Sequence, residues 1–229
     1  MGLSRVSAVL FDLDETLCDY RRSSSEVLEL AFDEIGVDPL FDVDSYHRIA
    51  ERYIDEVESK AERRARCFAD LAERKGHDRS LGREVARAYA DLRDHGDVVA
   101  FADCQEVLSE FGTECALGIV TNGEAAMQNP KLDALGIREH IESIVYAGIE
   151  TPAKPATDPF EHALADLGAS ADHAIFVGNS LDTDIRGANR AGLTSVWMPL
   201  DRDADANPQT EMDEPDYRID SLGDIRTLF

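Results

Sequence analysis

The chain has 229 residues, and its 47 acidic residues outnumber 23 lysines and arginines to give a formal net charge of −24. A charge of this size repels phosphate backbones and anionic lipid surfaces, so nucleic acids and membranes are not expected partners. An acid-rich composition in which only Lys60, Lys75, Lys131 and Lys154 are lysines is typical of salt-loving microbes, where molar salt screens the repulsion. An ordinary acidic cytoplasmic protein is the alternative.

The cysteines and the apolar runs indicate a cytoplasmic protein. Cys18, Cys67, Cys104 and Cys115 form no CxxC pair and no Cys/His spacing typical of zinc, which favours free thiols in a reducing compartment. No apolar run reaches the roughly 18–20 residues that a membrane span needs. The apolar stretch 6–11 is too short for a signal peptide and runs directly into acidic residues. We therefore expect a cytoplasmic monomer or homodimer.

Short apolar runs predict the strands of a parallel sheet. The first is Val6–Phe11, a nearly continuous apolar run of the kind that forms strands covered on both faces. Similar runs follow at 116–120, 143–147, 174–177 and 194–198. Amphipathic helical patterns lie between them, at 105–111, 159–167 and 185–191. This alternation predicts a doubly wound, Rossmann-like α/β fold, which would end in an edge strand at 217–221 and a terminal helix.

Residues 19–97 interrupt the alternation with helical patterns and no convincing strand. Apolar side chains recur there at helical spacing, and glycines punctuate the patterns, which cover 26–35, 44–57, 65–71 and 85–92. We therefore predict a smaller α-helical domain at 19–97, inserted into an α/β core domain formed by residues 1–18 and 98–229.

Two acidic residues, Asp12 and Asp14, directly follow the first expected strand. Ligands of open parallel sheets bind beyond the carboxyl ends of the strands, and residues two apart in an extended chain point to the same side. Clustered carboxylates repel each other unless a cation lies between them, and Mg²⁺ prefers carboxylate and water oxygens. The pair therefore indicates a magnesium site. Acids that merely end a strand and cap the next turn are the alternative.

Polar residues also follow two later strands. Thr121 and Asn122, with Gly123 after them, could hydrogen-bond phosphate oxygens, although Thr-Asn-Gly is also good turn chemistry. Lys154 lies between two prolines that restrict the backbone on both sides, so its side chain starts from a fixed place. A solvated loop lysine is the alternative for that position.

Residues 178–185 form the last polar segment, after the strand expected at 174–177. Asn179, Asp182 and Asp184 could reach a metal ion from there. Acidic side chains in the first turn of a helix are the alternative, because the helix dipole favours them, and this alternative best describes Asp182.

Together these segments resemble the haloacid dehalogenase superfamily, in its phosphatase-rich branch with a helical cap inserted after the first strand. The resemblance covers essentially the whole chain, and four motifs in the family's order are far more specific than any one of them. They are Asp12-Leu13-Asp14-Glu15-Thr16, Thr121-Asn122-Gly123, Lys154-Pro155 and the segment from Gly178 to Asp184.

The resemblance implies a role for each matching residue. Asp12 would be the nucleophile that forms an aspartyl-phosphate, and Asp14 would protonate the leaving alcohol and then activate water. Thr121 and the backbone near Asn122 would bind the phosphoryl group, and Lys154 would neutralise its charge. Mg²⁺ would bridge Asp12 and the phosphate. The implied function is magnesium-dependent removal of phosphate from a small phosphorylated metabolite.

One position departs from the family's pattern. The fourth motif usually begins Gly-Asp, and this chain has Asn179 at that aspartate. An amide oxygen can ligate Mg²⁺ but brings no charge, so Asn179 and Asp184 are both metal candidates beside Asp12 and Asp14. The alternatives are 2-haloacid dehalogenation, phosphomutase activity and a non-catalytic binding or scaffold role. Asp14 and Thr16 argue against the first, because the dehalogenases lack the second aspartate and need no metal.

Overall fold

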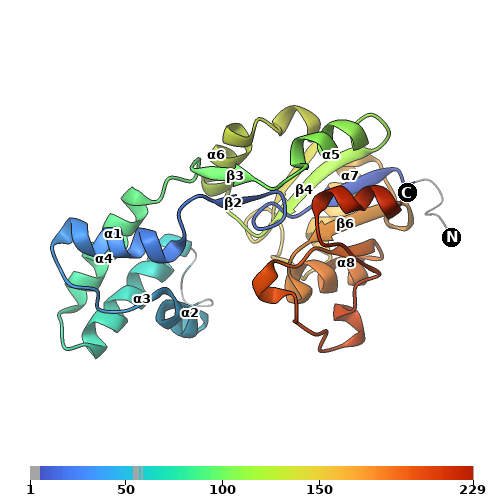
Figure 1. Ribbon diagram of the computed structural model, residues 1–229. Coiled ribbons are helices and arrows are strands. Elements are labelled where there is room, and N and C mark those ends of the chain that lie inside the picture. Colours follow the sequence, from blue (N-terminus) through green and yellow to red (C-terminus); the bar gives the residue numbers. More distant parts are fainter. Residues whose placement is uncertain (1–5, 54–56, 58, 229) are drawn as a thin grey trace. The chain divides into compact units, whose positions relative to one another are not determined.

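The computed structural model of the protein describes residues 6–53, 57 and 59–228. The chain divides into two compact units, of which unit 1 combines Met1–Tyr20 with His95–Phe229 and unit 2 is Arg21–Asp94 (Figure 1). The domain boundaries expected from the sequence lie within a few residues of these divisions.

A six-stranded parallel sheet forms the centre of unit 1. Its strands are β1 (Ala8–Phe11), β4 (Ala116–Thr121), β5 (Ser143–Tyr146), β6 (Ala174–Gly178), β7 (Thr194–Trp197) and β8 (Tyr217–Arg218). The strand order is β5-β4-β1-β6-β7-β8, so β1 lies between β4 and β6. All neighbouring strands are parallel. The predicted parallel α/β sheet is confirmed, although β8 is only two residues long.

Helical segments cover both faces of this sheet. They are α5 (Cys104–Phe111), α6 (Ala125–Leu135), α7 (Asp158–Leu167), α8 (Arg186–Ala191) and the 3-10 segment η7 (Leu222–Leu228). Val9 and Phe11 of β1 belong to a core layer shared with α5, α6 and η7. Ala8 and Leu10 belong to the opposite layer, which is shared with α7 and α8. Because all four side chains are fully buried, β1 is apolar on both faces and the sheet is doubly wound.

A short antiparallel pair lies where the chain leaves and re-enters unit 1. It joins β2 (Cys18–Tyr20) to β3 (Val98–Ala100), with Tyr20 opposite Val98. The sequence indicated no strand immediately after residue 18. Strands of three residues are too short to show the alternation of apolar and polar side chains on which that prediction depends.

Unit 2 is helical. Its elements are α1 (Ser24–Ile35), α2 (Val43–Ala50), η1 (Glu51–Tyr53), α3 (Lys60–Arg74) and α4 (Arg79–Leu92). Phe32, Phe41, Phe68 and Tyr89 meet in its core. A Cβ atom on Gly82 would lie 2.2 Å from the carbonyl oxygen of Phe68, so α3 and α4 approach closely there. The helix predicted at 44–57 ends earlier, at Ala50, and 54–56 lie outside the described residues.

Three expectations about unit 1 differ from the structure. Helix α6 was not foreseen, and it contains Pro130. The helix expected at 185–191 begins with a π-helical turn, η4 (Leu181–Ile185). The terminal helix is the 3-10 segment η7 rather than an α-helix. The remaining 3-10 turns are η2 (Arg138–His140), η3 (Ala171–His173), η5 (Asp201–Asp203) and η6 (Glu211–Asp213). Among the described residues, no helix is long and apolar enough to span a membrane.

Candidate active site

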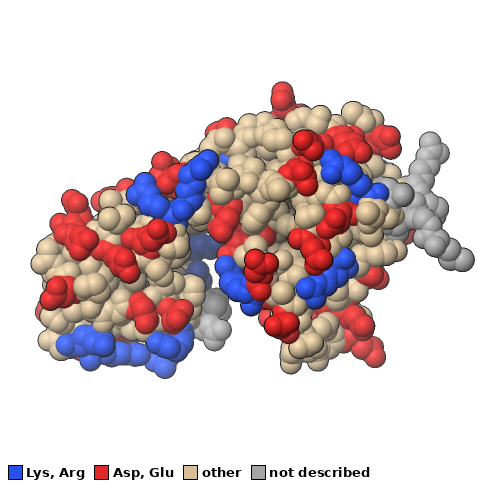
Figure 2. Space-filling model, in the orientation of Figure 1, with Lys and Arg blue, Asp and Glu red and all other residues tan. Residues whose placement is uncertain are grey.

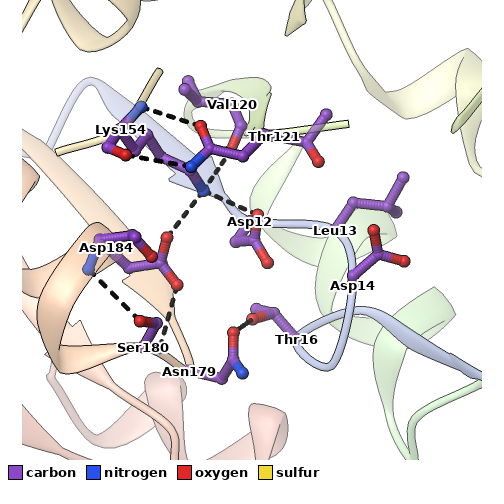
Figure 3. Close-up of polar contacts among 12 residues, drawn as sticks. Asp12, Leu13, Asp14, Thr16, Val120, Thr121, Lys154, Asn179, Ser180 and Asp184 are labelled. Carbon is purple, nitrogen blue, oxygen red and sulfur yellow. Dashed lines mark hydrogen bonds and ion pairs between the residues drawn. The ribbon is translucent and has the colours of Figure 1, made fainter. Parts of the chain in front are cut away.

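Three strand ends bring the candidate residues to one edge of the sheet. Asp12 directly follows β1, Thr121 is the last residue of β4, and Asn179 directly follows β6. Because β1 pairs in parallel with both β4 and β6, these carboxyl ends lie side by side (Figure 3). The backbone N–H of Asp12 donates to the carbonyl oxygen of Val177 at 2.9 Å, which extends the pairing with β6 to Asp12.

Lys154 reaches this edge from the loop after β5. Its Nζ donates to Asp12 Oδ1 at 2.7 Å, to Asp184 Oδ1 at 2.7 Å and to the carbonyl oxygen of Val120 at 2.8 Å. Lys154 is 4% exposed and Asp184 is 1% exposed, so one buried ammonium is shared by two buried carboxylates. All three ammonium protons are used, which fixes the side chain between β1 and β6.

Burial and charge act against each other in this cluster. Burial raises the pKa of Asp12 to about 7; the Lys154 ammonium opposes this rise, and the negative charges of Asp184 and Asp14 add to it. Burial lowers the pKa of Lys154, but the two carboxylates outweigh burial and leave that pKa above its ordinary value. Lys154 therefore stays charged, and the buried charge that is hardest to maintain is that of Asp12.

Asn122 holds the backbone of Lys154. Its Nδ2 donates to the carbonyl oxygen of Lys154 at 3.1 Å, and the Lys154 N–H donates to Asn122 Oδ1 at 2.8 Å. The Asn122 side chain, which we expected to bind phosphate, is therefore already bound to the backbone of Lys154 in the loop after β5. Phosphate binding near Asn122 stays a prediction, and it would fall to the backbone.

Asp184 is held close to the strand end by Gly178. A Cβ atom on Gly178 would lie 2.5 Å from the Cβ atom of Asp184, so this approach requires glycine. Asp184 Oδ2 accepts from the N–H of Ser180 at 3.0 Å, and Oδ1 accepts from Lys154. Both carboxylate oxygens therefore already have donors, and a place for Asp184 in a metal shell stays a prediction.

Asp14 lies apart from the Lys154 ammonium (Figure 3), and its carboxylate contacts residues of α6. Its Oδ2 accepts from Gln128 Nε2 at 2.7 Å, and its Oδ1 forms an ion pair with Lys131. The expectation that Asp12 and Asp14 would point to the same side is wrong. The backbone turns after Asp12, since the carbonyl oxygen of Leu13 accepts from later N–H groups, so the two acids do not lie on one extended strand. Asp12 consequently pairs with Lys154, and Asp14 pairs with Lys131.

Gln128 and Lys131 are the site residues that the sequence analysis missed. Both lie on α6, and each is 1% exposed. Burial lowers the pKa of Lys131, but Asp14 and Tyr20 outweigh burial and raise it. The scarcity of lysine was a signal that could have found Lys131, because a lysine kept in a lysine-poor sequence is more often functional than a random surface charge.

Asn179 is oriented by its neighbours. Its Nδ2 donates to Glu15 Oε2 at 3.2 Å, and its Oδ1 accepts from the Thr16 hydroxyl at 3.5 Å. Its carbonyl oxygen accepts from the indole N–H of Trp197 at 2.8 Å. Glu15 has a left-handed backbone with φ of 61° and also pairs with Arg202. The amide nitrogen of Asn179 is thus hydrogen-bonded to the Glu15 carboxylate, and the amide oxygen faces Thr16 in the loop after β1.

The donors at this edge fit a magnesium ion. The described residues contain no cluster of three or more His, Cys, Asp and Glu side chains suited to hold a metal. The oxygens that could hold such an ion are the Asp12 carboxylate, the backbone carbonyl of Asp14 that the resemblance implies, and the amide oxygen of Asn179, which also accepts from Thr16. These are hard oxygen ligands, and Mg²⁺ typically takes one or two carboxylates and keeps several waters. The set carries less negative charge than a shell with a second aspartate.

Comparisons with known proteins identify the family of this chain. Residues 6–192 match the haloacid dehalogenase-like hydrolases. N-acylneuraminate-9-phosphatase of Mus musculus is 30% identical over 249 residues, which cover 100% of this chain and 95% of the relative. Glyceraldehyde 3-phosphate phosphatase of Methanopyrus kandleri is 32% identical, with 94% of this chain and 93% of the relative covered.

A solved structure supports the fold. The structure of YfnB from Bacillus subtilis, determined with bound magnesium, superposes with a TM-score of 0.76 over 98% of this chain and 99% of that one. The sequence identity is 24%, so this likeness concerns the fold.

Proposed function

Because the chain belongs to the haloacid dehalogenase-like hydrolases, we propose that it is a magnesium-dependent phosphatase. It removes phosphate from a small phosphorylated metabolite through an aspartyl-phosphate intermediate. The observation that carries this proposal is the buried Lys154 ammonium 2.7 Å from Asp12, with a second acid, Asp14, two residues along the chain.

In the first step, the Asp12 carboxylate attacks the phosphorus. A bond forms between Asp12 and phosphorus, and the bond from phosphorus to the ester oxygen breaks. Asp14 gives its proton to that oxygen, so the product leaves as a neutral alcohol. Lys154 offsets the charge of Asp12 and the phosphoryl oxygens, and the Thr121 hydroxyl donates to one of those oxygens.

In the second step, Asp14 removes a proton from water, and the resulting hydroxide attacks the phosphorus. The bond to Asp12 breaks, inorganic phosphate leaves, and Asp14 holds the proton needed for the next turnover. Bound magnesium supplies positive charge to the phosphoryl oxygens, and Asp12, the Asp14 carbonyl and Asn179 would hold it.

The relatives indicate the substrate class. The mouse and Methanopyrus kandleri relatives are named for phosphatases of an acylneuraminate and of glyceraldehyde 3-phosphate. Both names denote a phosphate ester of a small oxygen-rich carbon compound. We extend this class to the present chain.

Hydrolysis of p-nitrophenyl phosphate and of a panel of sugar phosphates tests the proposal. We expect turnover with Mg²⁺, loss of turnover with EDTA, and no turnover by Asp12→Asn. Halide release from 2-chloropropionate without metal would instead support a dehalogenase. Absence of both activities would leave the scaffold alternative, and equal phosphatase activity in Asp12→Asn would refute the assigned nucleophile.

A further inference from the structure

Helix α6 places one buried glutamine between two residues assigned to catalysis. Gln128 Nε2 donates to Asp14 Oδ2 at 2.7 Å and to Thr121 Oγ1 at 2.7 Å. Thr121 ends β4, whereas Asp14 belongs to the loop after β1. A single amide group therefore connects two segments of unit 1 that are far apart in the sequence.

The direction of these hydrogen bonds matters for the chemistry. A primary amide has two hydrogen atoms, and Gln128 uses one for each partner. Because Thr121 Oγ1 accepts from Gln128, the hydroxyl proton of Thr121 is directed to another acceptor, such as a phosphoryl oxygen. Reversing the amide would bring its oxygen against the Asp14 carboxylate. In the orientation shown, the amide donates to both partners, and this prepares Thr121 as a donor.

The amide oxygen of Gln128 indicates that stability alone does not explain this residue. Its Oε1 is buried, and no donor for it lies among the described residues. An unsatisfied buried acceptor costs about 1–3 kcal/mol. A methionine of similar length would fill the same space without that cost, so stability alone would not favour glutamine here.

Gly123 makes room for this side chain. A Cβ atom on Gly123 would lie 2.1 Å from Gln128 Nε2 and 2.4 Å from Gln128 Cδ. The backbone of Gly123 has no left-handed φ that would itself require glycine. The glycine of the Thr-Asn-Gly motif is therefore explained by the approach of the Gln128 amide and not by the turn.

We propose that Gln128 is a positioning residue that fixes the Thr121 hydroxyl and the Asp14 carboxylate relative to each other, with Gly123 as its cradle. This inference rests on the proposed phosphatase function. Asp14 acts on the leaving oxygen, so its alignment matters most for esters whose alcohol is a poor leaving group. p-Nitrophenolate leaves readily and needs little protonation.

The test compares two substrates in Gln128→Met, in the full-length protein with Mg²⁺. We expect kcat for an alkyl phosphate such as glycerol 3-phosphate to fall by about 100-fold, and kcat for p-nitrophenyl phosphate by about tenfold or less. KM should change less than kcat. The melting temperature should stay close to that of the wild type, because the relieved Oε1 offsets the lost hydrogen bonds.

Gly123→Ala provides an independent second variant, since its added methyl group displaces the Gln128 amide and leaves Gln128 unchanged in sequence. Gly123→Ala, like Gln128→Met, should lose more kcat for glycerol 3-phosphate than for p-nitrophenyl phosphate. Gln105→Met is the matched control, because the Gln105 amide donates to the carbonyl oxygen of Leu135, outside the site. Both substrates should be hydrolysed by this control as by the wild type.

The outcomes separate the two proposals. A wild-type protein that hydrolyses neither ester overturns the proposed function, and the positioning role falls with it. An active wild type with Gln128→Met losing equal activity on both esters, or losing none, overturns the positioning role alone. If Gln128→Met fails to fold, Gly123→Ala decides between these outcomes by the same ratio of rates.

Discussion

Asn122 and Lys154 bind each other through a reciprocal pair of hydrogen bonds, side-chain amide to backbone carbonyl and backbone N–H to side-chain oxygen. The pair aligns the loop that delivers the Lys154 ammonium to Asp12. We expect Asn122→Ala to lower kcat by about 10- to 100-fold, because a loosened ammonium stabilises the transferring phosphoryl group less well. Steady-state kinetics with p-nitrophenyl phosphate measures this loss.

Asn122→Asp should lie between the wild type and Asn122→Ala, since a carboxylate still accepts from the Lys154 N–H but cannot donate to its carbonyl. Asn189→Ala is the matched control. Asn189 also holds backbone carbonyls, those of Met212 and Glu214, but away from the lysine loop. A comparable loss of kcat in this control would contradict the assignment of Asn122 to Lys154.

Asp12→Asn should stabilise the metal-free protein at pH 8. Burial raises the pKa of Asp12 from 3.8 to about 7, so between these values the folded protein holds the proton more tightly than the unfolded chain. The contribution of this carboxyl to folding is therefore favourable at low pH and is lost as the pH rises through about 7. An uncharged amide avoids that loss, and we expect a gain of about 1–3 kcal/mol at pH 8.

Thermal unfolding in EDTA between pH 5 and 8 measures this difference. The advantage of Asp12→Asn should narrow toward pH 5, where the wild-type carboxyl is protonated. Asp182→Asn is the control, because Asp182 is an exposed acid that pairs with Arg186 and not with Lys154. If Asp12→Asn is no more stable than the wild type at pH 8, or is more stable by the same amount at every pH, then burial does not raise the pKa of Asp12.

Asn179→Asp should tighten magnesium binding. A carboxylate adds the negative charge that the present donor set lacks, and calorimetric titration with Mg²⁺ should show an increase in affinity of about tenfold. The same change replaces the hydrogen bond to Glu15 with repulsion between two acids. We therefore expect a lower melting temperature in EDTA and a larger stabilisation by Mg²⁺ than in the wild type.

Gln105→Glu adds the same charge at an exposed position on α5 and serves as the control. It should leave magnesium affinity unchanged. If Asn179→Asp and Gln105→Glu behave alike, Asn179 is not part of the metal shell.

Stability should rise with KCl. The net charge is −24, and acidic side chains are spread over the face of each unit seen in Figure 2. Screening shortens the range of their repulsion from about 10 Å at 0.1 M salt to about 3 Å at 1 M. We expect the midpoint of urea unfolding to increase steadily from about 0.1 M to about 3 M KCl. A flat profile would favour an ordinary acidic protein.

Helix α6 shows where sequence patterns fail. Five strands of the six-stranded sheet, β1, β4, β5, β6 and β7, were predicted because each is a nearly continuous apolar run, and most helices because apolar side chains recur on one face. In α6 two of the inward positions belong to Gln128 and Lys131, and Pro130 lies between them. Gln128 and Lys131, which make this helix important for the site, are polar residues at positions where an amphipathic helix has apolar ones. The apolar pattern that predicts a helix is therefore missing at this helix.

Chain order and residue type alone determined the fold class, the acidic surface and the set of strand ends at which chemistry could occur, because these depend on local apolar runs and on composition. The tertiary structure alone decided which group binds which. Asp14 turns to α6, Asp184 to Lys154 and Asn122 to the lysine backbone. Such partners come from segments distant in sequence, and only the packing of the sheet and its helices brings their atoms within hydrogen-bonding distance.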